Sequence, residues 1–287
     1  MGDSRIAAGE RRLDGARVLV TGGSAGIGLE ASRQLARSGA TVVIAARDLD
    51  AVQAAVAGLD GGGHQGLALD VSDEGAWAGV MASIDAVGPL HGLVTAAGLL
   101  GPIGPLEDVA PAEFSRTIAV NLTGTMLALY HALPRLRGSG GRAVTFSGGG
   151  ASTPFPRYDA YAVSKAAVVR LTENVAAASA VEVNCVAPGF VATRIHEATL
   201  RAGPELAGSV YHERTRALLD EGGFPAGEAA ELVCFLLSDA AAGITGRLLS
   251  AQWDPWREEE FLARLRADPE LATLRRIDDQ AFGRLHR

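Results

Sequence analysis

This sequence has few cysteines and histidines and no long apolar run. Its 287 residues include only two cysteines, Cys185 and Cys234, and both sit in apolar stretches. We therefore expect buried thiols rather than a disulfide. The six histidines show no metal-ligand spacing, so we expect no metal site.

Two further absences narrow the partners and the location. No apolar run reaches the ~18–20 residues of a membrane-spanning helix, and the start lacks the apolar region of a signal peptide. An excess of positive charge is also missing, because the formal net charge is −7. This balance argues against nucleic acid as the main partner. We expect a cytoplasmic protein that acts on a small-molecule substrate and binds neither membrane nor nucleic acid.

Short apolar runs alternate with longer helical patterns through most of the chain. The predicted strands are 16–23, 40–46, 66–70, 90–98, 142–148 and 181–189. The predicted helices are 28–39, 48–59, 73–87, 111–137 and 158–179. Strands that alternate with helices indicate βαβ units and a parallel sheet covered on both faces. The predicted fold is a single α/β domain with a Rossmann-type doubly wound parallel sheet.

Residues 190–226 depart from this alternation. They carry several glycines and prolines, which is typical of a lid or binding loop in a compact domain. The polar residues of this lid favour a hydroxylated substrate such as a keto-sugar or cyclitol; alternatively, they are solvated helix faces. These polar residues are Arg194, His196, Arg201, His212, Glu213, Arg214 and Arg216. We assign residues 1–252, lid included, to one domain.

Residues 253–287 form a charged C-terminal extension with one predicted helix near 257–267. Two tryptophans and a proline lie at its start. We expect them to anchor the tail near the lid or on a neighbouring subunit. These residues are Trp253, Pro255 and Trp256.

The stretch VTGGSAGIGLE follows the first predicted strand and opens a helix. Its Gly22, Gly26 and Gly28 have a Gly-x-x-x-Gly-x-Gly spacing. Glycines let the backbone turn tightly and approach a pyrophosphate, and the helix N-terminus supplies free N–H groups. In this strand–turn–helix context the spacing predicts a dinucleotide-binding loop.

This loop, together with Tyr161-Ala-Val-Ser-Lys165, resembles the short-chain dehydrogenase/reductase family over roughly residues 13–252. The resemblance implies that Asp70-Val71 contacts the adenine and that Pro188–Thr193 cradles the nicotinamide. The cofactor-binding residues it implies, with Arg47 argued below, are Gly22, Ser24, Gly26, Ile27, Gly28, Arg47, Asp70, Val71, Ala97, Gly98, Tyr161, Lys165, Pro188, Gly189, Val191 and Thr193.

The end of the second strand bears on the choice of cofactor. An acidic residue there would bond the adenine-ribose 2′-hydroxyl and repel a 2′-phosphate. That position is Ala46, and Arg47 follows it. A guanidinium suits a phosphate, so we expect NADP(H) in preference to NAD(H). The alternative is a solvated arginine at a strand end.

The predicted catalytic residues are Tyr161, Lys165 and Asn121. Tyr161 and Lys165 are four residues apart on a helix, so both side chains lie on one face. We expect Tyr161 to exchange a proton with the substrate oxygen, and the Lys165 ammonium to lower the pKa of the phenol. The resemblance implies that Lys165 also bonds the nicotinamide ribose and that Asn121 holds a water against it.

The family's usual catalytic serine is missing. Counting back from Tyr161, its position is Gly148, and Ser147 would point away from the substrate in a regular strand. Three explanations stay open. Tyr161 and backbone N–H groups suffice; another hydroxyl, from Ser152, Thr153 or the substrate, fills the gap; or the chain is inactive and only binds cofactor.

The leading hypothesis is an NADP(H)-dependent oxidoreductase that interconverts a ketone and a secondary alcohol, on a sugar-like or cyclitol-like substrate. The alternatives are a 3-oxoacyl thioester reductase and a non-catalytic cofactor-binding regulatory protein. The helices at 111–137 and 158–179 form the main subunit contact in many family members, so the resemblance implies a homodimer or homotetramer.

Overall fold

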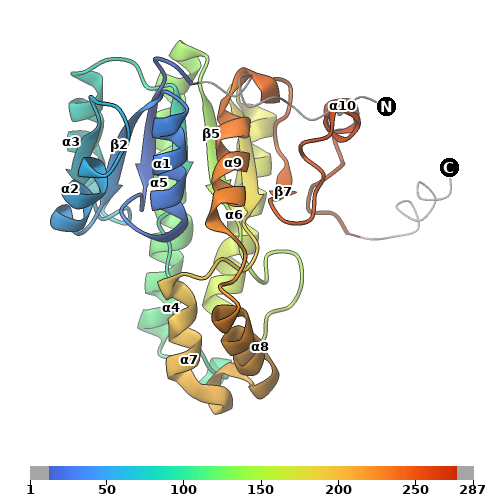
Figure 1. Cartoon of the computed structure of the whole chain (residues 1–287). Coiled ribbons are helices and arrows are strands. Elements are labelled where there is room, and N and C mark those ends of the chain that lie inside the picture. Colours follow the sequence, from blue (N-terminus) through green and yellow to red (C-terminus); the bar gives the residue numbers. More distant parts are fainter. Residues whose placement is uncertain (1–12, 277–287) are drawn as a thin grey trace.

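Seven parallel strands form the centre of the molecule in the computed structural model, which describes residues 13–276 apart from the side chain of Arg194 (Figure 1). The strands are β1 (Arg17–Thr21), β2 (Thr41–Ala46), β3 (Gln65–Ala68), β4 (Gly92–Thr95), β5 (Arg142–Phe146), β6 (Glu182–Ala187) and β7 (Leu248–Ser250). Their order across the sheet is β3-β2-β1-β4-β5-β6-β7, and all neighbours are parallel. The predicted doubly wound sheet is confirmed.

Helices cover both faces of this sheet (Figure 1). One face carries α1 (Gly26–Arg37), α2 (Leu49–Ala57) and α9 (Ala226–Leu237). The other carries α3 (Glu74–Asp85), α5 (Gly124–Ser139) and α6 (Asp159–Ala178). Burial on both sides explains why the central strands are near-continuous runs of Val, Leu and Ile. Both cysteines are buried and neither forms a disulfide, as predicted.

The helix predicted over 111–137 is interrupted. It consists of α4 (Pro111–Ile118), a π-helical turn (Ala119–Thr123) and α5. The Thr125 hydroxyl donates to the Asn121 carbonyl at 2.7 Å within this widened stretch. Isolated π turns occur mostly at functional sites, and this one contains Asn121.

The lid is more regular than its composition suggested. It forms α7 (Arg194–Ala207) and α8 (Ser209–Asp220), which project beyond the sheet in Figure 1. Gly203 kinks α7 and Gly208 separates the two helices, both with positive φ. The glycines that made the segment look irregular therefore mark the breaks between helical pieces.

The tail packs on α9 and not on the lid. Trp256 is fully buried, with its ring centroid 5.8 Å from that of Phe235 on α9, while Trp253 is 77% exposed. Helix α10 (Glu259–Ala267) adds its buried Leu262 and Leu265 to the same core. The expectation of an anchor near the lid is wrong, because Trp256 and the α10 leucines are buried in the core that includes α9; an anchor on a neighbouring subunit stays a prediction. The end of the predicted extension, 277–287, lies outside the described residues.

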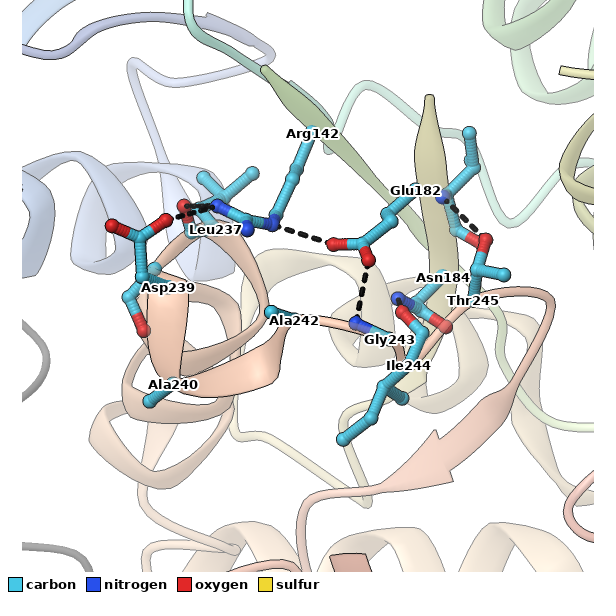
Figure 2. A network of polar contacts seen from close by, with 12 residues as sticks. Arg142, Glu182, Asn184, Leu237, Asp239, Ala240, Ala242, Gly243, Ile244 and Thr245 are labelled. Carbon is cyan, nitrogen blue, oxygen red and sulfur yellow. Dashed lines mark hydrogen bonds and ion pairs between the residues drawn. The ribbon is translucent and has the colours of Figure 1, made fainter. Parts of the chain in front are cut away.

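A network of polar contacts lies at the amino ends of β5 and β6 and joins them to the loop after α9 (Figure 2). The Arg142 guanidinium donates to the Glu182 carboxylate at 2.7 Å and to the Asp239 carboxylate at 3.0 Å. Glu182 also accepts the N–H of Gly243 at 2.6 Å, and the Asn184 amide donates to the Ile244 carbonyl at 2.7 Å. The network ties the loop after α9 to the sheet.

Between residues 13 and 276 we find no helix that is both long and apolar enough to cross a membrane. No cluster of metal-ligating side chains occurs in that part of the chain either.

Candidate active site

A single cavity of about 1200 Å³ lies at the carboxyl ends of the strands. All of the residues expected to bind the cofactor line it, from Gly22 after β1 to Thr193 at the start of α7. The cavity spans the point between β1 and β4 where the strand order reverses, which is where doubly wound sheets bind ligands. The individual roles of these cofactor-binding residues stay predictions.

The glycine loop has the close packing that a phosphate-binding turn requires. Gly22 has φ +70°, and a Cβ built on it would lie 2.6 Å from the Ala97 nitrogen. A Cβ on Gly28 would lie 2.4 Å from the Gly22 carbonyl oxygen. No side chain caps the start of α1, so its first N–H groups remain available to an anion.

Asp70 and two arginines line the cavity beyond β2 and β3. The Asp70 carboxylate accepts the Ser72 hydroxyl at 2.6 Å and the Ser72 N–H at 3.0 Å. These hydrogen bonds lower the pKa of Asp70, and the charges of Arg47 and Arg116 lower it further. The sequence did not point to Arg116, because only the packing of α4 brings it to this end of the cavity.

Tyr161 and Lys165 lie on one face of α6, as their spacing predicted. The Lys165 ammonium donates to the Phe146 carbonyl at 3.0 Å and lies 5.7 Å from the centroid of the Tyr161 ring. Lys165 is the only lysine in the chain. Burial lowers its pKa to about 8 and raises the pKa of Tyr161. The expected lowering of the phenol pKa by the lysine is thus outweighed by desolvation of both groups.

Asn121 lies behind this pair. Its amide exchanges two hydrogen bonds with the backbone of Leu99, at 2.7 and 2.9 Å, and donates to the Ser164 hydroxyl at 2.9 Å. Ser164 in turn donates to the Tyr161 carbonyl at 2.7 Å. Ser164 therefore links the helix that carries Tyr161 to the π turn, a role that no sequence pattern indicated.

Gly148 lies directly against the hydroxyl of Tyr161. A Cβ built on Gly148 would be 2.3 Å from Tyr161 Oη and 2.9 Å from its Cζ. With Tyr161 in this position, no side chain fits at 148 unless the phenol moves. Ser152 and Thr153 are exposed and do not line the cavity, so neither replaces the serine in this structure.

The lid contributes fewer polar groups to the cavity than expected. Of the polar lid residues named from the sequence whose side chains are described, only His196 lines it; Glu197, which was not among them, lines it as well. Arg201 is exposed and paired with Glu197, and His212 is buried away from the cavity. Much of the remaining wall is apolar or aromatic. It includes Leu100, Pro102, Phe155, Ile195, Ala198, Tyr211 and Leu219.

Known proteins resemble this chain along most of its length. The profile of the family described as "Enoyl-(Acyl carrier protein) reductase" matches residues 22–252. D-threitol dehydrogenase of Mycolicibacterium smegmatis is 36% identical, over 82% of this chain and 90% of its own length. Cis-4-hydroxycyclohexanecarboxylate dehydrogenase of Sinomonas cyclohexanicum is 35% identical, over 81% and 93%.

Solved structures resemble it as well. The crystal structure of levodione reductase superposes with a TM-score of 0.75 at 28% identity, covering 83% of this chain and 96% of that one. The two curated relatives are named as dehydrogenases, and the solved structure is named as a reductase. The chain therefore belongs to the short-chain dehydrogenase/reductase family and is an NAD(P)-dependent oxidoreductase that acts on CH–OH and C=O groups.

Proposed function

We propose that this protein interconverts a ketone and a secondary alcohol with NADP(H), and that Tyr161 exchanges the proton. The observation that carries the proposal is the pairing of Tyr161 with Lys165 on the cavity wall, backed by Asn121. At the other end of the same cavity, Arg47 and Arg116 are two cations near Asp70. They suit the 2′-phosphate that distinguishes NADP(H) from NAD(H).

The residues divide the chemistry as follows. The nicotinamide, when bound, supplies or accepts the hydride. In the reducing direction, Tyr161 Oη–H gives its proton to the substrate oxygen, and the raised pKa of the buried phenol keeps that proton present at neutral pH. Lys165, held by the Phe146 carbonyl, places a positive charge beside the phenolate that forms. Oxidation runs the same transfers in reverse.

The site works without the missing serine because the phenol occupies the space that a side chain at position 148 would need. Tyr161 Oη lies where a side chain on Gly148 would begin. The tyrosine hydroxyl, together with the backbone beside it, is therefore the donor that meets the substrate oxygen. This arrangement is a rearranged oxygen site rather than a crippled one.

The substrate that suits the cavity is a compact ketone or alcohol with an apolar frame and a further hydroxyl, such as a cyclitol-like ring. The apolar wall favours the frame, and the relatives named for threitol and for a hydroxycyclohexane carboxylate act on such hydroxyl groups. A 3-oxoacyl thioester is the second candidate, since the matching family profile is described as a reductase of acyl chains bound to acyl carrier protein.

The test is turnover of NADPH against a panel of cyclohexanone, hydroxycyclohexanones, keto-sugars and a 3-oxoacyl thioester, in wild type, Gly148→Ser and Gly149→Ser. Gly148→Ser should lose roughly tenfold or more in kcat/KM on every substrate turned over, because its side chain displaces the phenol. Gly149→Ser is the matched control, because this exposed glycine also lines the cavity but the nearest atoms to its Cβ position belong to the Phe155 ring, at 3.2 Å, and not to Tyr161. A gain in Gly148→Ser across the panel would mean that the wild-type site is defective.

We also propose that the chain forms a homodimer or homotetramer through α5 and α6. Large apolar side chains are exposed there, namely Met126 and Tyr130, one turn apart on α5, and Val163 on α6. Exposed large apolar side chains on these two helices are what a subunit contact would cover. Sedimentation of wild type against Tyr130→Glu tests this; a wild-type monomer would contradict it.

A further inference from the structure

We propose that His196 is a substrate-binding residue that donates a hydrogen bond from Nε2 to a hydroxyl of the substrate other than the reacting oxygen. His196 thereby selects hydroxylated ketones over their unsubstituted analogues. The inference rests on the proposed function, since it assumes that Tyr161 meets the reacting oxygen.

The position of His196 is set by a rigid platform. Its ring stacks on Phe190, with centroids 3.9 Å apart and planes inclined by 24°. The Phe190 carbonyl accepts the Phe224 N–H at 2.7 Å, so the backbone of the platform is tied to the segment that leads into α9. From there His196 reaches the cavity wall beside Ile195 and Ala198. A stacked ring loses little further freedom when it binds a ligand.

The hydrogen-bonding capacity of the ring is unused by residues 13–276. Nδ1 is fully buried without a partner, and no hydrogen bond from Nε2 to the described residues occurs either. An apolar residue would avoid the cost of the unpaired Nδ1, so packing alone does not explain a histidine here. Nε2 is not among the fully buried unpaired atoms, and it is the ring nitrogen that a ligand in the cavity can reach.

The ring is a neutral donor. Burial lowers the pKa of His196 to about 4, so it carries no charge at neutral pH. Unpaired buried N–H groups are rarer than unpaired buried acceptors, which favours a bare Nδ1 and a proton on Nε2. A neutral Nε2–H donates to an alcohol oxygen of the ligand. It cannot pair with a ligand ammonium or with another group that only donates. In a largely apolar wall, this one donor discriminates strongly between a substrate with a hydroxyl and one without.

The experiment compares cyclohexanone with 2-, 3- and 4-hydroxycyclohexanone in wild type, His196→Phe and His196→Gln. Phenylalanine keeps a ring to stack on Phe190 but has no donor, whereas glutamine keeps a donor at about the distance of Nε2. We expect His196→Phe to lose roughly tenfold to a hundredfold in kcat/KM on the preferred hydroxyketone and to change little on cyclohexanone. His196→Gln should recover much of the loss. Arg201→Gln, an exposed change on the same helix, is the control.

A second measurement does not depend on catalytic turnover. In imidazole nitrogen NMR of the NADP⁺ complex, the Nε2 signal of His196 should shift when 1,4-cyclohexanediol is added. The signal should not shift when cyclohexanol is added. Equal losses on all ketones in His196→Phe, or an Nε2 signal that ignores the diol, would overturn the proposal. Failure of wild type to turn over any ketone of the panel would instead contradict the proposed function, and the NMR result would still decide the role of His196.

Discussion

At the amino ends of β5 and β6 the polar side chains pair with one another, whereas at the carboxyl ends two of those that line the cavity do not, although Asp70 and Lys165 there are hydrogen-bonded. Arg142, Glu182 and Asp239 satisfy each other in the network of Figure 2. Within residues 13–276, neither Arg47 nor His196 has a hydrogen-bond or ion-pair partner for its side chain.

This difference indicates that paired polar residues at the amino ends of the sheet stabilise the fold, whereas unpaired ones at the carboxyl ends are available to bind a ligand. A group whose partners are all supplied by the chain holds the fold together and has nothing left to bind. A group at the cavity that lacks a partner costs stability and is available to a ligand. Changes at the two ends should therefore affect different measurements.

The largest expected effect belongs to the cavity end. Tyr161→Phe removes only the hydroxyl and should lower kcat by roughly 10²–10⁴-fold, because the proton donor is lost. Cofactor affinity and the midpoint of unfolding should stay near wild type. Stopped-flow turnover and NADPH fluorescence titration measure the two. A variant that keeps most of its kcat would contradict the role of Tyr161.

Arg47→Ala should come next. Loss of a charge-assisted bond to phosphate should weaken NADP(H) by roughly ten- to a hundredfold, while NAD(H) binding changes little. Arg116→Ala should act in the same direction with a smaller effect. Titration of both cofactors measures this, with the exposed Arg33→Ala as control. If both cofactors weaken equally, the preference for NADP(H) is wrong.

At the amino end, Arg142→Ala should lower the free energy of unfolding by about 1–3 kcal/mol, since it leaves a partly buried Glu182 without its main partner. The kcat/KM of the folded enzyme should not change. Arg135→Ala is the matched control, because its pair with Asp85 is more exposed and should contribute about 0–1 kcal/mol. Urea unfolding tests both, and equal losses would remove the distinction.

The smallest expected effect is a dependence of the free energy of unfolding on pH. Lys165 has a pKa of about 8 when folded and cofactor-free, below its ordinary 10.5. Between these values the unfolded chain binds more protons at this group, so Lys165 should raise stability with pH by about 1 kcal/mol per unit. Burial raises the pKa of Cys185 to about 11, so this thiol acts in the opposite direction above pH 9, and Tyr161 does so above pH 10.

Because Lys165 is the only lysine, ¹⁵N-lysine labelling gives a single side-chain signal whose titration reports its pKa directly. Lys165→Met should abolish the rise in stability between pH 8 and 10. A Lys165 signal that titrates near 10.5 would show that burial does not control this group.

Much of the cavity could be predicted from short patterns. The spacing of Gly22, Gly26 and Gly28, and of Tyr161 and Lys165, reflects geometry within one turn or one helix, so it can be read along the chain. The same holds for the alternation that predicted the sheet. The interrupted helix at 119–123 and the helical lid were missed, because hydrophobic periodicity does not reveal a π turn or a glycine that separates two helices.

The residues that the patterns missed share one property. Arg116 and Ser164 matter only through what lies opposite them, which is Asp70 and Asn121 respectively, and His196, named only as one of seven polar lid residues, is singled out by Phe190. Those pairs are far apart in the chain or belong to different elements, so no local spacing marks them.

The sequence by itself determined the sheet, the phosphate loop and the tyrosine–lysine pair, because each depends on residues within a few positions of one another. Only the tertiary structure decided how the missing serine is accommodated, since that required the Tyr161 hydroxyl to be seen 2.3 Å from the Cβ position of Gly148. It also decided that the pKa of the phenol is raised rather than lowered, because desolvation depends on everything that packs around a group and not on its neighbours in the chain.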